Sequence, residues 1–228
     1  AAGCPGDTDR PATPSESRLQ LNPISFSLVV VVFVAVALAT MGFAAPPRVA
    51  PAVAAPAAAP VELQVPVIVR SDWTPQTHAG ARTGQVDDVV IHHFWRPSLD
   101  HVAAPADEMA LLRQVERSHL GKGWSGLAYN FVVFQSGRVY EVRGWGREGA
   151  HTKGVNAHSV GIAFAIDGDR VRPTDAAWQA AKDLIEDGVA AGHLGDDVHV
   201  SGHNEHAAKA CPGRHLVPHL HDLEPATA

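Results

Sequence analysis

The chain has 228 residues, a formal net charge of -6 and 46% hydrophobic residues, which permits one domain with appendages. The mild acidity and the absence of a lysine- or arginine-rich run exclude the basic face that phosphate binding needs, so we expect no nucleic-acid partner. The 14 histidines favour a metal site, because histidine is the commonest metal ligand, although we expect most of them on the surface.

Three segments precede the predicted globular part. Residues 1–23 are polar and rich in turn-forming residues, which predicts a disordered tail. Residues 24–45 carry no charge and, at ~1.5 Å per residue, can span the ~30 Å hydrocarbon core of a bilayer. They are either the apolar part of a cleaved export signal or an uncleaved membrane anchor, and their length slightly favours the anchor. Residues 46–61 form an Ala/Pro-rich linker that we expect to be extended and semi-rigid.

The globular domain is predicted over residues 62–224, which is enough chain to bury a sizeable core. Apolar runs of strand length alternate with runs of helical spacing. The predicted strands are 87–94, 128–134, 138–142, 159–166 and 197–203, and the predicted helices are 105–119 and 174–191. Two of the strands are joined by a short Gln-Ser-Gly turn, which predicts a hairpin. Strands interleaved with helices predict an α/β fold with a mixed central β-sheet flanked by helices.

Three residues of this domain are candidate metal ligands. His92 and His203 lie where two predicted strands end, and Cys211 follows eight residues after His203 in the run KACPG. Zinc binds imidazole nitrogen and thiolate sulfur, and a catalytic zinc site keeps three protein ligands with a fourth position open to water. Spacing alone favours an interpretation without metal, in which the two histidines lie at strand ends and the cysteine is a buried thiol. The neighbouring motifs decide between this interpretation and a zinc site.

Four motifs occur in order: VVIHHFW, GWSGLAYNFVVFQSGRVYEVRGWG, GAHTKGVNAHSVGIAF and VSGHNEHAAKACPG. In sequence and spacing they resemble the peptidoglycan recognition protein and type 2 N-acetylmuramoyl-L-alanine amidase family, which includes phage amidase-type lysozymes. The resemblance covers residues 67–216. It implies one zinc ion, a peptidoglycan glycopeptide as substrate, and hydrolysis of the bond between the lactyl group of N-acetylmuramic acid and L-alanine.

The resemblance also implies a role for each residue that matches a family motif. The implied zinc ligands are His92, His203 and Cys211, the implied catalytic residues are Tyr129 and Lys209, and the implied substrate-binding residues are His151 and Asn156. A free lysine or tyrosine has a pKa of about 10, so we expect Lys209 to stabilise negative charge and Tyr129 to hydrogen bond. Phe94 departs from the family, which usually has Thr or Ser after the His pair.

Two other functions stay open at this stage. The domain is also compatible with a recognition module that binds peptidoglycan without hydrolysing it, or with a zinc hydrolase of another acyl-amide. We expect an extracytoplasmic protein, either secreted or held at the membrane through residues 24–45, acting in bacterial wall remodelling or as a phage lysin. We expect it to act as a monomer.

Overall fold

The computed structural model describes residues 64–76, 80–94 and 104–225. The predicted tail, apolar run and linker therefore lie outside the described residues. Among the described helices, none has both the length and the apolar character to cross a membrane. All described residues belong to one compact unit.

A six-stranded sheet forms the centre of this unit, with the strand order β1-β4-β3-β5-β2-β6. The strands are β1 (Val67–Ile68), β2 (Val86–His93), β3 (Phe131–Val133), β4 (Val139–Glu141), β5 (Ser159–Phe164) and β6 (Leu194–Gly202). Only the β3–β4 pair is antiparallel among these pairings, and the others are parallel. The mixed sheet and the hairpin predicted from the sequence are thus confirmed.

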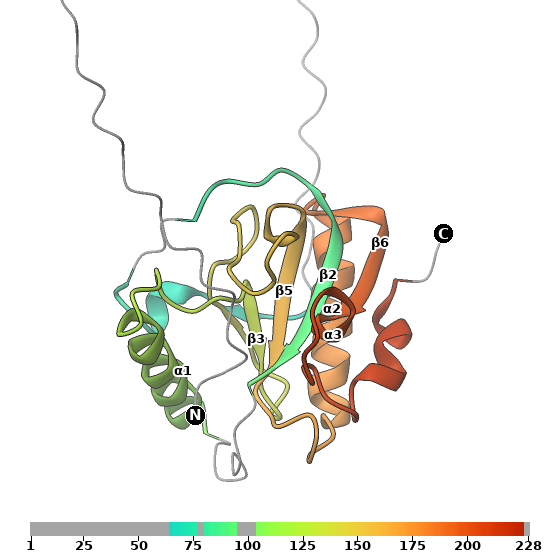
Figure 1. The fold of residues 1–228 in the computed structure, drawn as a ribbon. Coiled ribbons are helices and arrows are strands. Elements are labelled where there is room, and N and C mark those ends of the chain that lie inside the picture. The colour runs from blue at the N-terminus through green and yellow to red at the C-terminus, as the bar shows by residue number, and fades with distance from the viewer. Residues whose placement is uncertain (1–63, 77–79, 95–103, 226–228) are drawn as a thin grey trace, which may run out of the picture. The chain divides into compact units, whose positions relative to one another are not determined.

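Two long helices cover the sheet, one on each face (Figure 1). The helices are α1 (Pro105–Leu120), α2 (Asp175–Ala190) and the short α3 (His203–His206), with 3-10 turns η1 (Arg70–Asp72), η2 (Asn156–His158) and η3 (Val217–Leu223). Successive side chains of a strand point to opposite faces. Ile91 therefore packs in the core against α2, whereas its neighbour His92 points to the face that carries α1.

The ends of the helices follow from local chemistry. Thr174 accepts a hydrogen bond from the backbone N–H of Ala177, which caps α2 as its position in the sequence predicts. Pro105 occupies the first turn of α1, where the missing N–H costs nothing, and acidic residues follow it there. Gly192, just beyond α2, has a φ of 72°, a conformation that favours glycine.

Two buried carboxylates fasten distant segments to the helices. Glu108 in α1 is fully buried and accepts hydrogen bonds from Ser136, Arg138 and Tyr140 of the β3–β4 hairpin. Asp187 in α2 accepts hydrogen bonds from the backbone N–H groups of residues 64 and 65, at 2.9–3.1 Å. The hairpin and the start of the described domain are thereby held against different helices.

The structure differs from the sequence prediction by three or more residues, or by a missed element, at three places. The last strand begins at Leu194, three residues before the predicted start, and it ends at Gly202, so His203 is the first residue of α3. Residues 128–130 are buried but lie outside β3. The two-residue strand β1 was not predicted as a strand.

Candidate metal centre

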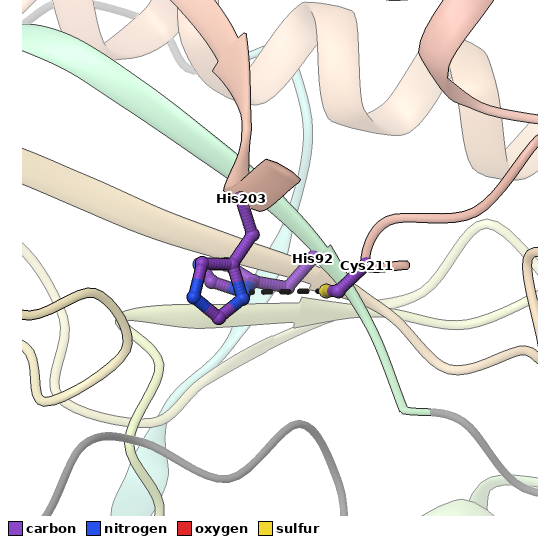
Figure 2. Close-up of side chains that lie close together, drawn as sticks. All are labelled: His92, His203 and Cys211. Carbon is purple, nitrogen blue, oxygen red and sulfur yellow. Dashed lines mark hydrogen bonds between the residues drawn. The ribbon is translucent and has the colours of Figure 1, made fainter. Parts of the chain in front are cut away.

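Three buried side chains meet at the C-terminal edge of the sheet: His92, His203 and Cys211 (Figure 2). Ile91 of β2 pairs with Gly202 of the parallel strand β6, so the next residue after each of them is one of the two histidines. Cys211 reaches the same place on the segment that follows α3. One ligand atom from each residue lies within 4.8 Å of the others. The structure therefore brings together the three residues that the sequence indicated as metal ligands.

The spacing of this group fits a zinc ion. With zinc–sulfur bonds of about 2.3 Å, zinc–nitrogen bonds of about 2.0–2.1 Å and tetrahedral angles, a ligand sulfur and nitrogen lie about 3.6 Å apart. The Cys211 Sγ and the His92 Nδ1 are 3.5 Å apart. The Nδ1 of His203 is buried and has no hydrogen-bond partner among the described residues, a costly state that a metal bond or a water would relieve. Both the donor set and its spacing thus suit zinc.

A third histidine fixes the orientation of His92. The Nδ1 of His92 faces Cys211, and its Nε2 lies 3.1 Å from the Nδ1 of His151. Thr152 Oγ1 lies 3.3 Å from the same Nε2. A histidine that gives one nitrogen to a metal normally donates the N–H of the other to a neighbour. Here His151 and Thr152 are positioned to accept that hydrogen bond, which would hold the His92 ring in place.

His151 and Asn156, which the resemblance assigned to substrate binding, lie side by side in the loop before β5. His151 is only 2% exposed, and burial lowers its pKa well below the usual value, assisted by the nearby His92 and His203. Asn156 Oδ1 accepts hydrogen bonds from the backbone N–H groups of His151 and Thr152, at 3.0 and 2.9 Å. The contacts of these two residues therefore shape the loop beside His92.

Two glycines make room for the His151 ring, a requirement that the sequence analysis missed. A Cβ on Gly161 would lie 2.5 Å from the Cγ of His151, and one on Gly149 would lie 2.8 Å from its Nε2. Real Cβ atoms essentially never approach so closely, so any side chain at either position would displace the ring. The small residues within GAH and SVGIAF are the sequence signal for this packing.

Tyr129 lies on the same side of the site as His92. Its ring is 1% exposed, with its centroid 5.2 Å from that of His92. Phe94, the residue that departs from the family pattern, is also buried and stacks on Tyr129 with centroids 5.7 Å apart. Phe94 therefore supports the tyrosine ring from the end of β2.

A buried arginine holds the loop that leads to Tyr129. Arg143 donates to the carbonyl of Leu127 at 2.8 Å, to the carbonyl of Glu148 at 3.0 Å and to Ser125 Oγ at 3.2 Å. Burial lowers the pKa of Arg143 to about 10. At neutral pH the guanidinium remains charged, so its hydrogen bonds to the loop are strong. Sequence reasoning missed this role, because the partners are carbonyls and a hydroxyl rather than an acidic residue.

Lys209 differs from the other candidates in its exposure. It lies two residues before Cys211 and is exposed, whereas the cysteine is buried. Its backbone N–H donates to the carbonyl of Ala207 at 2.7 Å. The Lys209 side chain is thus open to solvent, two residues along the chain from a buried candidate ligand.

Comparison with known proteins agrees with this geometry. Residues 82–214 match the family described as N-acetylmuramoyl-L-alanine amidase. Peptidoglycan-recognition protein 1 of Holotrichia diomphalia is 31% identical over 160 residues, which cover 69% of this chain and 80% of that protein.

Solved structures give the same result. The structure of bumblebee PGRP-SA has a TM-score of 0.66 at 31% identity and covers 69% of this chain and 95% of that one. A second similar structure is that of peptidoglycan recognition protein-LE, which was solved in complex with tracheal cytotoxin, a monomeric diaminopimelic acid-type peptidoglycan. Its TM-score is 0.63 at 32% identity, and the match covers 68% of this chain and 92% of that one. The chain therefore belongs to the family of peptidoglycan-recognition proteins and N-acetylmuramoyl-L-alanine amidases.

Proposed function

We propose that this protein is a zinc-dependent N-acetylmuramoyl-L-alanine amidase. The substrate is the amide bond between the lactyl group of N-acetylmuramic acid and L-alanine in peptidoglycan. The observation that carries the proposal is the buried group of His92, His203 and Cys211, whose spacing and donor atoms suit one zinc ion. Membership of the family supports peptidoglycan as the ligand.

The donor set also suits hydrolysis. Two neutral imidazoles and one thiolate leave a net positive charge at the site when zinc is bound, and zinc in such a site lowers the pKa of water to about 7 and polarises a carbonyl. With three protein ligands, a bound zinc ion would keep a position for water or substrate, as catalytic zinc sites generally do. Hydrolysis adds water across the amide, giving a lactyl carboxylate on the sugar and a free amino group on L-alanine.

Tyr129 and Lys209 supply the remaining functional groups. Negative charge develops on the carbonyl oxygen as the amide is attacked, and donors aimed at that oxygen stabilise it. The exposed Lys209 contributes a positive charge that reaches the substrate. Tyr129, whose ring lies next to that of His92, contributes a hydroxyl that donates a hydrogen bond to the reacting amide. His151 and Asn156 order the loop that borders the bound glycopeptide.

A second function has a specific observation in its favour. The relatives named above are recognition proteins, and one of them is solved in complex with a peptidoglycan fragment. Proteins named for recognition thus resemble a chain that also matches the family described as N-acetylmuramoyl-L-alanine amidase. The chain carries every residue to which the resemblance assigns a role in zinc binding or catalysis, which favours hydrolysis over recognition alone: His92, His203, Cys211, Tyr129 and Lys209.

The arrangement of the chain suits a substrate outside the cytoplasm. We propose that residues 24–45 direct export or anchor the chain, that residues 46–61 separate the domain from the membrane, and that residues 62–224 act on the wall as a monomer. Wall remodelling by a bacterium and lysis by a phage both agree with this arrangement.

The test is product analysis with purified peptidoglycan. The zinc-loaded chain is incubated with cell walls, and mass spectrometry and amino-terminal labelling detect free stem peptides that begin with L-alanine. We expect such peptides from the wild type and none from Cys211→Ser or after chelation. Binding to the walls without release of peptides would establish recognition instead, and release of other fragments would contradict the proposed bond.

A further inference from the structure

The segment that carries Cys211 is held by a turn from another part of the chain. The Gly168 turn (residues 167–169) follows β5, and the Cys211 segment (residues 211–215) follows α3. The N–H of His215 donates to the carbonyl of Gly168 at 3.0 Å. Arg214 donates from its backbone N–H to Asp169 Oδ1 at 3.1 Å and from its Nε to the Asp169 carbonyl at 2.7 Å. Three hydrogen bonds thus join the two segments.

Close backbone packing accompanies these hydrogen bonds. A Cβ on Gly168 would overlap the carbonyl oxygen of Pro212 and lie 2.8 Å from Leu216 Cδ1. A Cβ on Gly213 would lie 2.6 Å from the carbonyl oxygen of Gly168. The two segments can approach this closely only because both positions are glycine. The contact is therefore specific to the residues found here.

His93 connects this packing to the metal ligands. It is the second residue of the histidine pair, and its side chain points away from His92, as strand alternation predicts. Its buried Nδ1 accepts a hydrogen bond from the N–H of Gly168 at 2.9 Å. Its backbone N–H donates to the Cys211 Sγ at 3.4 Å. One residue thus contacts both the turn and the thiol.

We propose that His93 and the Gly168 turn are positioning residues that hold the Cys211 thiolate at the metal centre and so set the affinity for zinc. The inference rests on the proposed function only in taking zinc as the metal. The His93 side chain holds the Gly168 turn, and the close contact of Gly168 with Pro212 and Gly213 holds the Cys211 segment. These contacts fix the Cys211 segment before any metal binds. A thiolate already in place binds zinc without the cost of ordering the segment. Residues that support metal ligands in this way typically contribute 10–100-fold to metal affinity.

The test measures zinc affinity by competition with a chromophoric chelator, using the purified 228-residue chain. His93→Leu removes the acceptor for the Gly168 N–H, whereas His93→Asn keeps an acceptor at the same distance along the side chain. Gly168→Ala introduces the clash with Pro212. Gly84→Ala is the matched control, because a Cβ at Gly84 meets nothing within 4 Å and its φ is ordinary. Each variant is also melted in chelator, which reports the stability of the metal-free fold.

We expect His93→Leu and Gly168→Ala to bind zinc about 10–100-fold more weakly, with His93→Asn and Gly84→Ala close to the wild type. With cobalt in place of zinc, the thiolate-to-cobalt charge-transfer absorption should weaken in the same two variants. Because either of them can fail to fold, Asp169→Ala, which removes only one hydrogen bond to Arg214, is measured as well, and a smaller loss of affinity is expected.

Three outcomes would overturn the inference, and they are distinguishable from one another. A wild type that binds no zinc would overturn the proposed function together with this inference. A wild type that binds zinc, with folded His93→Leu, Gly168→Ala and Asp169→Ala binding it equally well, would overturn the inference alone. Equal weakening by His93→Asn and His93→Leu would also contradict it, since the hydrogen-bond acceptor would then have no effect.

Discussion

Replacing Glu108 with glutamine should destabilise the domain by about 3 kcal/mol. The carboxylate is fully buried and accepts four hydrogen bonds: from Ser136 at 2.6 Å, from Arg138 at 2.7 and 3.1 Å, and from Tyr140 at 2.8 Å. Glutamine has nearly the same shape but replaces one acceptor oxygen with a donor. Whichever oxygen is replaced, two of these donors lose their acceptor and face an NH₂ group.

The magnitude follows from the exposure of these partners. A hydrogen bond to a charged group contributes about 1.5–3 kcal/mol. The Arg138 side chain is 32% exposed, so water replaces part of what it loses, and the lower end of the range applies to it. The Tyr140 hydroxyl is buried, and burial together with Glu108 raises its pKa, so it stays a hydrogen-bond donor throughout the accessible pH range. Two lost bonds at the lower end give about 3 kcal/mol.

The assay is thermal and urea unfolding at a fixed zinc concentration, because bound metal shifts stability. For a domain of this size about 3 kcal/mol corresponds to a fall in Tm of roughly 6–12 °C. Asp107→Asn makes the same chemical change at an exposed residue of the same helical turn, where only the interaction with the helix N-terminus is lost, and should alter stability by no more than about 1 kcal/mol. A Glu108→Gln variant with the same Tm as Asp107→Asn would refute the idea that the hydrogen bonds to Glu108 stabilise the hairpin.

Three further predictions concern the site and its surroundings. Zinc at about 1,000 times its Kd should stabilise the wild type by about 4 kcal/mol, which chelation removes, whereas the Tm of Cys211→Ser should not respond to zinc. Lys209→Ala should lower turnover by a factor of about 10²–10³ with zinc content unchanged. The control Lys182→Ala, in the helix on the other face of the sheet, should have the turnover of the wild type. An unchanged turnover in Lys209→Ala would contradict a catalytic role for this lysine. His119 is fully buried, and burial, with Lys122 as the next cause, lowers its pKa to about 4 from 6.5. Its folded pKa lies below the unfolded one, so the stability linked to it is complete above pH 6.5 and falls by up to about 3 kcal/mol as the pH drops to 4. Urea titrations across this range should show a shallower loss in His119→Phe, and equal slopes would contradict the assignment.

The sequence predicted those strands and helix ends that are determined by the pattern of neighbouring residues. Alternating or continuous apolar runs located the main strands, and a capping threonine located the start of α2. The start of β6 was placed at Asp197, three residues too late, because Gly195 and Asp196 are residue types depleted in strands, yet Leu194 pairs with Val86 across a register shift. Asn130 was predicted within a strand, but its side chain accepts a hydrogen bond from the N–H of Gly161 and donates to the carbonyls of Gly144 and Arg147. Such partners cannot be read from local pattern.

At the site, the motifs indicated the ligands, but the residues that hold them could not be predicted. The contact between His151 and His92 joins positions 59 residues apart, and it depends on two glycines that leave space for a ring. The role of Gly168 is equally invisible in the sequence, because the clash that excludes a side chain comes from Pro212, far along the chain. Long-range packing of this kind appears only in three dimensions.

The attachment of the first described residues to α2 has a mechanical consequence if residues 24–45 anchor the chain, as proposed above. Tension on the chain before Gln64 enters the domain through hydrogen bonds to Asp187. That helix packs on the face of the sheet opposite to His92, so the force passes into the core behind the sheet. A pull on such an anchor would thus load α2 before it loads the strand ends next to the candidate ligands His92 and His203.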